Sequence, residues 1–212
     1  MFFTIEEQKL ENEIVEKKSR FIATLFYVNS EEQAQEILKN IKKQYYDARH
    51  NCYAYRIMTD NGVLERFSDD CEPSWTAGGP MLNILSKNNL CNILVVVTRY
   101  FGGILLGTGG LVRAYSDATS KVLEMSTIAN ETIGLEVEIE IDYNELEMLK
   151  YYCKKNEINI VNTVYEDNIK CYLEVTKDEL ETLLDKNNSN CSILNNKIVA
   201  TKNIRKKVRN WR

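Results

Sequence analysis

The stretch that most constrains the fold is residues 92–120, where an apolar run, a glycine-rich turn and a helical pattern follow one another directly. The run Ile93–Val97 is short, β-branched and apolar on both faces, which predicts a buried central strand. After the turn, apolar residues recur at three- and four-residue spacing from Leu111 to Val122, as on one face of an amphipathic helix. The sequence therefore predicts a buried strand that a tight turn joins to a helix.

The turn itself holds five glycines among the nine residues from Gly102 to Gly110. Glycine permits positive φ and close approach of the backbone to another group. The first four N–H groups of a helix lack intrahelical partners and lie at the positive end of its dipole, so this turn has the properties of an anion site. Its spacing is neither that of the P-loop nor that of the dinucleotide-binding motif. The alternative is a tight turn packed against a neighbouring segment.

Two arginines flank the turn and make it the preferred site for a phosphate or another anion. Arg99 ends the strand and Arg113 lies in the first turns of the helix, so both can meet an anion together with the free N–H groups. Alternatively, the arginines pair with a nearby acidic loop and connect the two segments, and the two arrangements can coexist. The predicted anion- or nucleic-acid-binding residues are Arg99, Gly102, Gly103, Gly107, Thr108, Gly109, Gly110 and Arg113.

The irregular segment Ser68–Pro80 is the second place where chemistry is expected, because three carboxylates lie within four positions. Carboxylates are ligands of Mg²⁺ and Ca²⁺, but no regular ligand spacing is present. The stronger alternative is that these short acidic side chains accept hydrogen bonds from loop N–H groups. We predict no metal site, no cofactor and no assigned catalytic residue. The loop candidates are His50, Asp69, Asp70, Glu72 and Thr76.

His50 is the single histidine of the chain and would be the natural general base of an enzyme. A lone histidine at the start of a strand is more often structural. Hydroxyl and thiol nucleophiles such as Cys52, Cys71 and Thr76 are present, but without a G-x-S-x-G elbow or a comparable setting. The sequence leaves enzymatic activity uncertain and favours a binding protein.

Length and composition bound the class of protein. The 212 residues suffice for one large domain or two small ones, and 44% hydrophobic with 27% charged residues is ordinary for a soluble globular chain. No signal-peptide pattern and no membrane-length apolar run occurs, so we expect a cytoplasmic protein with no membrane partner. The six cysteines form no C-x-x-C pair and are expected to be free thiols.

The net charge of −4 is unevenly distributed. Residues 1–131 carry 14 basic and 17 acidic residues, residues 132–200 carry 7 and 14, and residues 201–212 carry 6 and none. The acidic body argues against broad, non-specific binding of nucleic acid and leaves room for a local basic patch. The basic end, residues 205–212 with Trp211, has the composition to hold phosphates, but a solvated, mobile tail is favoured.

Residues 1–130 are predicted as a first domain of mixed helices and strands. Two strands, over 12–17 and 20–28, precede a helix that Ser30 caps and that ends near Tyr45. The further expected elements are strands over 51–58 and 63–67 joined by an Asn-Gly turn, and a short helix over 81–85 after Pro80.

Residues 131–204 are predicted as a second domain in the order β-α-β-β-α-β, the split motif of ferredoxin-like folds. In its first strand apolar residues alternate with Glu136, Glu138 and Glu140, so one face is buried and the other is wet and acidic. The expected strands cover 133–141, 158–165, 169–175 and 197–201, and the helices cover 143–156 and 178–186.

Several linked motifs resemble the IMPACT/YigZ family over most of residues 1–125. They are Lys18–Ala23, Ala48–Arg56, Ser68–Asp70, Glu72–Pro73, Thr76–Gly78, Val96–Gly103 and Leu106–Tyr115. The resemblance implies an α+β protein with an N-terminal α/β domain like that of a small-subunit ribosomal protein and of elongation factor G. It implies a ferredoxin-like C-terminal domain of the bacterial YigZ branch. It also implies a link to translation, because eukaryotic IMPACT proteins regulate translation through a starvation-responsive kinase pathway.

This chain departs from the family pattern at Cys71 and Trp75, where glycine is usual. If those glycines let a ligand approach, the two side chains would obstruct it. If they serve a turn, the side chains would strain the backbone. Trp75 would alternatively offer a stacking face for a base.

Together these features predict a regulator that binds RNA, the ribosome or a translation-related protein at the glycine turn. One alternative is a hydrolase-type enzyme that uses Asp69, Asp70 and Glu72. Another is a protein-binding regulator that uses the acidic sheet face. No oligomeric state is predicted.

Overall fold

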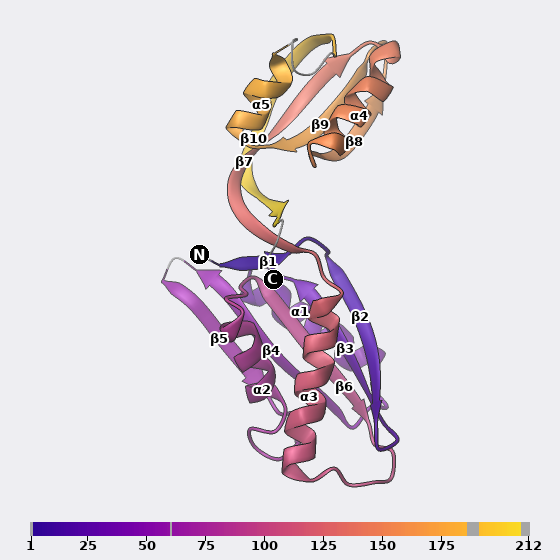
Figure 1. Cartoon of the computed structure of the whole chain (residues 1–212), viewed down its shortest axis with the longest axis vertical. Helices are drawn as coiled ribbons and strands as arrows, with labels where there is room; N and C mark the ends of the chain where they lie inside the picture. Colours follow the sequence, from indigo (N-terminus) through magenta and orange to yellow (C-terminus); the bar gives the residue numbers. More distant parts are fainter. Residues whose placement is uncertain (1, 60, 186–190, 209–212) are drawn as a thin grey trace. The chain divides into compact units, whose positions relative to one another are not determined.

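The computed structural model describes residues 2–59, 61–185 and 191–208 and contains two compact units (Figure 1). Unit 1 runs to Asn130 and also includes Val208, whereas unit 2 comprises Glu131–Lys207. Both units combine helices with antiparallel strand pairs, which confirms the predicted α+β class. Within the described ranges, no helix is both long enough and apolar enough to cross a membrane.

Unit 1 is built on a five-stranded sheet in the order β2-β3-β6-β4-β5. The predicted central strand is confirmed: β6 lies in the middle of the sheet and is buried along nearly its whole length. Its burial on both faces explains the continuous apolar run in its sequence. The strands are β2 (Lys9–Glu16), β3 (Ser19–Tyr27), β4 (His50–Thr59), β5 (Gly62–Ser68) and β6 (Ile93–Tyr100).

Helices cover both faces of this sheet (Figure 1). Alternate residues of β6, including Val95 and Val97, pack with the helices α2 (Gly78–Lys87) and α3 (Gly107–Glu124). The intervening Leu94 and Val96 pack with α1 (Glu31–Gln44) on the other face. The sheet is thus the middle layer of unit 1, and α3 runs along it directly after the glycine turn.

The ends of the helices and strands show where local sequence patterns were sufficient to predict the structure. Ser30 caps α1 by accepting a hydrogen bond from the Gln33 N–H at 3.2 Å, as predicted. The predicted hairpin is present, because Thr59 pairs with Gly62, but Gly62 is the first residue of β5 and does not lie between the paired strands as the Asn-Gly signal suggests. Two helices begin earlier than predicted, because α2 starts at Gly78 rather than at 81 and α3 starts at Gly107 rather than at 111.

Unit 2 has the predicted β-α-β-β-α-β order, with β10 beside β7 in a sheet of order β10-β7-β9-β8. The predicted last strand, 197–201, is too short: β10 continues to Lys207, so residues 205–207 belong to a strand. Residues 209–212, with Trp211, lie outside the described residues. The elements are β7 (Ile128–Ile141), α4 (Leu146–Lys155) after a 3₁₀ turn (Tyr143–Glu145), β8 (Asn159–Tyr165), β9 (Ile169–Val175), α5 (Lys177–Leu184) and β10 (Ile193–Lys207).

Apolar and acidic residues alternate along β7, and the apolar ones lie on the buried face as predicted. Val137 and Ile139 are fully buried in the unit 2 core. The glutamates between them have partners on neighbouring strands. Glu136 pairs with Lys202 at 2.6 Å, and Glu138 accepts a hydrogen bond from the Tyr172 hydroxyl at 2.7 Å. Lys202 of β10 therefore neutralises part of the β7 face that the alternating glutamates make acidic.

The first three residues of β7 belong to unit 1. There Ile128–Asn130 pair with β1 (Phe3–Ile5), and the Val208 N–H donates to the Ile128 carbonyl oxygen at 2.8 Å. Unit 1 is therefore assembled from segments that lie on both sides of unit 2 in the sequence.

Candidate functional site

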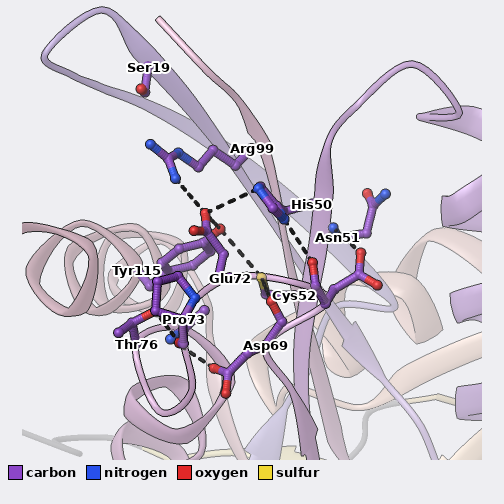
Figure 2. A network of polar contacts seen from close by, with 12 residues as sticks. Ser19, His50, Asn51, Cys52, Asp69, Glu72, Pro73, Thr76, Arg99 and Tyr115 are labelled. Carbon is purple, nitrogen blue, oxygen red and sulfur yellow. Dashed lines mark hydrogen bonds and ion pairs between the residues drawn. The ribbon is translucent and has the colours of Figure 1, made fainter. Parts of the chain in front are cut away.

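The candidate site of unit 1 gathers around Glu72, whose carboxylate is almost completely buried. The antiparallel register of the sheet places the start of β4 beside the end of β6, with His50 opposite Arg99. The loop after β5 brings in Glu72, and the buried face of α3 brings in Tyr115. Figure 2 shows these four side chains converging from four separate segments of the chain.

One oxygen of Glu72 carries all of these contacts. Glu72 Oε1 accepts hydrogen bonds from Arg99 Nη1 and, at 2.9 Å, from the Tyr115 hydroxyl. His50 Nε2 lies 3.8 Å from the same oxygen. His50 Nδ1 lies 2.7 Å from the Asp70 carbonyl oxygen, which can only accept, so Nδ1 carries a proton. The ring is held in a fixed orientation between the loop and the buried carboxylate.

Cys52 and Tyr115 are neutral donors inside this cluster. Burial raises the pKa of the Cys52 thiol, and burial likewise raises the pKa of the Tyr115 phenol. The Cys52 thiol donates to the Asp69 carbonyl oxygen at 3.0 Å and lies 3.4 Å from the Tyr115 hydroxyl. Because only a thiolate is a strong nucleophile, Cys52 acts here as a packed hydrogen-bond donor.

The other loop carboxylates hold the loop together. Asp69 accepts hydrogen bonds from three N–H groups, those of Trp75 at 2.8 Å, Ala77 at 3.0 Å and Gly78 at 2.9 Å. Asp70 accepts from the Asn51 N–H at 2.7 Å and lies 3.4 Å from Lys42. This is the predicted alternative in which acidic side chains satisfy loop N–H groups. Across the described ranges, no group of three His, Cys, Asp or Glu side chains is placed to hold a metal ion.

Thr76, the remaining loop candidate, is buried, and its hydroxyl donates to the Pro73 carbonyl oxygen at 2.6 Å. It therefore closes a turn of the loop. Of the loop candidates, the structure places His50 and Glu72 at a cavity and gives Asp69, Asp70 and Thr76 partners within the loop or beside it.

The glycine turn passes close to the β2–β3 hairpin before it enters α3. A Cβ at Gly102 would lie 2.0 Å from the Lys18 carbonyl carbon, and the Gly102 N–H donates to the Ser19 hydroxyl at 3.1 Å. Gly107 has a φ of +71° at the first residue of α3. The turn is therefore tightly packed at one end, as in the alternative interpretation, and open at the start of the helix, as in the anion-site interpretation.

A cavity of about 410 Å³ lies between this helix start and the Glu72 cluster. Arg99 is buried in its wall, and its Nε, also buried, has no hydrogen-bond partner among the described residues. The Arg99 guanidinium lies over the rings of Phe21 and Phe101, at 5.3 and 5.7 Å from their centres. The lining residues are Arg49, His50, Cys71, Glu72, Pro73, Arg99, Phe101, Leu105, Leu106, Gly107, Thr108 and Leu111.

The cavity contains only part of the predicted anion site. Arg99, Gly107 and Thr108 line it. Gly109 and Gly110 follow in the same helical turn, and Arg113 is exposed further along α3. Gly102 and Gly103 lie before the helix and shape the turn. The sequence also allowed the arginines to pair with the acidic loop, and the structure contains one such pair, between Arg99 and Glu72.

Several residues of the site were not singled out from the sequence. Tyr115 follows the apolar spacing of α3, which indicates only a core position, although a buried tyrosine hydroxyl normally needs a partner. Phe101 and Leu105 are exposed apolar residues in a turn, 44% and 82% accessible. Exposed apolar residues beside glycines would have been the available signal, because such patches mark binding sites.

The sequence and the structure both match known proteins. The profile of the Impact N-terminal domain matches residues 17–123, and that of a domain of unknown function matches residues 139–186. A Bacillus subtilis protein, "IMPACT family member YvyE", is 39% identical over 85% of this chain and 82% of its own. "IMPACT family member YigZ" of Escherichia coli is 37% identical over 71% of this chain and 74% of its own.

A solved structure described as that of a hypothetical protein covers 94% of this chain and 96% of its own. It is 29% identical and has a TM-score of 0.59. The domain match, the two curated relatives and this shared two-domain fold agree with the resemblance that the motifs of residues 1–125 carry. The chain belongs to the IMPACT family.

Proposed function

We propose that this protein is a regulator of translation that associates with RNA or the ribosome by binding phosphate groups at the start of α3. Family membership supports the link to translation, because the resemblance to IMPACT proteins implies it. The alternative hydrolase-type function receives less support, since Asp69 and Asp70 are engaged by backbone N–H groups and Glu72 by Arg99 and Tyr115.

The observation that carries the proposal is the uncapped start of α3. The residue before the helix, Leu106, makes no side-chain cap, and the first turn contains no acidic residue. The N–H groups at the start of an 18-residue helix are therefore left to solvent or to an anion. The adjacent Arg99 lines the same cavity and adds a positive charge beside these groups. Free N–H groups beside a guanidinium are the usual elements of a phosphate site.

The experiment is co-sedimentation with ribosomes and with RNA at low and moderate salt. Arg99 is unsuitable for substitution, because its loss would leave Glu72 as an unpaired buried charge. Arg49 lines the cavity and Arg113 lies further along α3, and both are exposed, so Arg49→Glu/Arg113→Glu is the test variant. Lys39→Glu/Lys43→Glu, on the exposed side of α1, changes the charge equally and is the matched control.

We expect binding that weakens with salt, because each phosphate contact releases counterions. We also expect it to be lost in the arginine variant and retained in the lysine variant. Equal losses in both variants would mean that net charge alone drives association. No co-sedimentation of the wild-type protein at low salt would overturn the proposal.

A further inference from the structure

The cavity beside α3 combines a polar inner wall with an apolar outer wall. Its inner wall contains Arg99, Glu72 and His50, all buried. Its outer wall contains Phe101 and Leu105, which are among the exposed apolar side chains of unit 1. A ligand that fits both walls has an anionic group attached to a flat apolar body.

We propose that this cavity receives the terminal nucleotide of a single-stranded RNA, with its terminal phosphate at the first turn of α3 and its base against Phe101. This inference rests on the proposed function and identifies the part of the RNA that the same site holds. A 5′ and a 3′ terminal phosphate both have this chemistry, and the binding experiment distinguishes between them.

The phosphate end is assigned from the groups available to it. The first-turn N–H groups of α3 have no side-chain cap, and Gly107 has no Cβ to keep an anion away from them. The Thr108 hydroxyl lies in the same wall. Arg99 lines the cavity and adds a positive charge beside these groups, while its Nη1 remains bonded to Glu72. These donors are sufficient for one phosphate group.

The base end is assigned from the apolar wall. Aromatic side chains and arginine planes are the usual stacking partners of unpaired bases. Phe101 presents an exposed ring, and the Arg99 guanidinium lies over that ring at 5.7 Å from its centre. Leu105 is 82% accessible and lies beside it in the lining. A covered base would remove this apolar surface from water.

Charge and size favour an end over an internal stretch of RNA. The cavity volume of about 410 Å³ is that of a small-molecule site. The residues of unit 1, 1–130 and 208–212, include 16 basic and 16 acidic ones, so unit 1 lacks the excess of positive charge that tracks a long backbone. Glu72 also places a negative charge in the wall, which disfavours a second phosphate nearby. One terminal phosphate satisfies these limits.

The direct test compares three forms of one oligoribonucleotide of about ten nucleotides, a usual length for single-strand binding domains. The forms carry a 5′ phosphate, a 3′ phosphate or neither, and fluorescence anisotropy follows binding through a label at the opposite end. We expect one phosphorylated form to bind roughly tenfold more tightly than the unphosphorylated form, as for one charge-assisted contact. The salt dependence should be shallow, about that of one or two phosphates.

A matched pair of variants separates binding from folding. A Cβ at Gly109 would meet open space, so Gly109→Asp places a carboxylate at the first turn of α3 without a steric conflict. That carboxylate stabilises the helix start and repels an anion from it. We expect Gly109→Asp to keep or raise the melting temperature and to abolish the preference for a terminal phosphate. Gly109→Asn, which is neutral and nearly isosteric, should keep the preference.

Cys71 supplies a second readout inside the cavity. All six cysteines lie in the described part of the chain, and Cys71 is the only exposed one. Because Cys71 lines the cavity, the preferred oligonucleotide should slow its alkylation by iodoacetamide. Bound RNA that leaves the alkylation rate unchanged would place the contact elsewhere and overturn the inference.

Two further outcomes decide against the inference in different ways. Equal affinity for all three oligonucleotides, with arginine-dependent ribosome binding intact, would remove the terminal-nucleotide inference alone. Absence of binding to any RNA and to ribosomes would remove the proposed function with it. Protection of Cys71 by N-acetyl-leucine, but by none of the oligonucleotides, would instead assign the cavity to a carboxylate-bearing peptide end.

Discussion

At the scale of single residues, the loop after β5 keeps glycine-like backbone conformations without glycines. Asp70, Cys71 and Trp75 have φ values of +39°, +69° and +63°. Glycine adopts this region freely, whereas a side chain costs about 1–2 kcal/mol there. The family's usual glycines at positions 71 and 75 therefore match positions whose backbone is left-handed in this protein.

Trp75 has a contact that compensates for this cost. Its ring packs against Phe67 with a centroid distance of 4.8 Å. It also covers Gly79, where a Cβ would lie 2.5 Å from the Trp75 ring. The tryptophan therefore fills the space over the first turn of α2, and its apolar contact offsets part of the backbone cost.

We predict that Cys71→Gly stabilises the protein. Release of about 1–2 kcal/mol of left-handed strain exceeds the 0.4–1 kcal/mol that added chain entropy costs, so the free energy of unfolding should rise by about 0.5–1 kcal/mol. Urea unfolding of the full chain measures the change. Cys71→Ala is the control, since it keeps the Cβ and the positive φ. Equal stability of the glycine and alanine variants would contradict the strain argument.

At the scale of elements, the start of α2 is set by a residue far outside the helix. Ala77 precedes the helix without a side-chain cap of its own, and Asp69 accepts the N–H groups of Ala77 and Gly78 instead. Local sequence gives no reason to begin a helix with two glycines, because glycine has a low helix propensity. This cap from eight and nine residues away explains why the sequence placed the helix start too late.

We predict that Asp69→Ala loosens the loop and the first turn of α2 together. Three N–H groups lose their acceptor, so the free energy of unfolding should fall by about 2–3 kcal/mol. Asp69→Asn keeps one acceptor oxygen and should lose less. Urea unfolding, with amide exchange at Ala77 and Gly78, measures both. A loss in Asp69→Ala below about 0.5 kcal/mol would show that water replaces the carboxylate at little cost.

Elements with a strong local period were predictable, and contacts across the sheet were not. Burial of β6 on both faces follows from its continuous apolar run, and the buried face of β7 with Val137 and Ile139 follows from the alternation of apolar residues with glutamates. The candidate site depends on register, because His50 meets Arg99 only through the pairing of β4 with β6. Loop glycines and acids marked the region, but the choice of Glu72 as the buried partner of Arg99 comes from tertiary packing.

At the scale of the whole molecule, charge is balanced by contacts between distant parts of the sequence. Lys202 of β10 lies 2.6 Å from Glu136 and 2.9 Å from Glu174. The composition of residues 132–200 alone, with 7 basic and 14 acidic residues, gives no sign of this pairing. Lys202 of the last strand therefore stabilises unit 2 itself.

These contacts predict how acid weakens unit 2. Partial burial alone would raise the pKa of Glu174, but hydrogen bonds from Asn159 and Lys202, with the Lys202 charge, lower the pKa below its usual 4.5. A lowered carboxyl pKa stabilises the folded state above the unfolded pKa, and this contribution disappears as the pH falls through the folded pKa. Stability should therefore decline below about pH 4.5.

The variant Glu174→Gln should reduce this decline, because it removes the titrating group. Hydrogen exchange of the β9 amides between pH 5 and 3 follows unit 2 specifically, since Glu174 lies in that strand. Glu181→Gln, on the exposed side of α5, is the control. An acid-induced increase in β9 exchange that is identical in wild type and Glu174→Gln would refute this account.

The two-part construction of unit 1 has a consequence for synthesis of the chain. The Val208 N–H that bonds Ile128, and the Val208 side chain that packs on the unit 1 core, follow residues 131–207 in the sequence. Domains generally fold as they emerge, in order from the N-terminus. All of unit 2 must therefore be synthesised before unit 1 can form its contacts with Val208. Closure of unit 1 is thus a late event in biosynthesis, and it occurs after unit 2 has had the opportunity to fold.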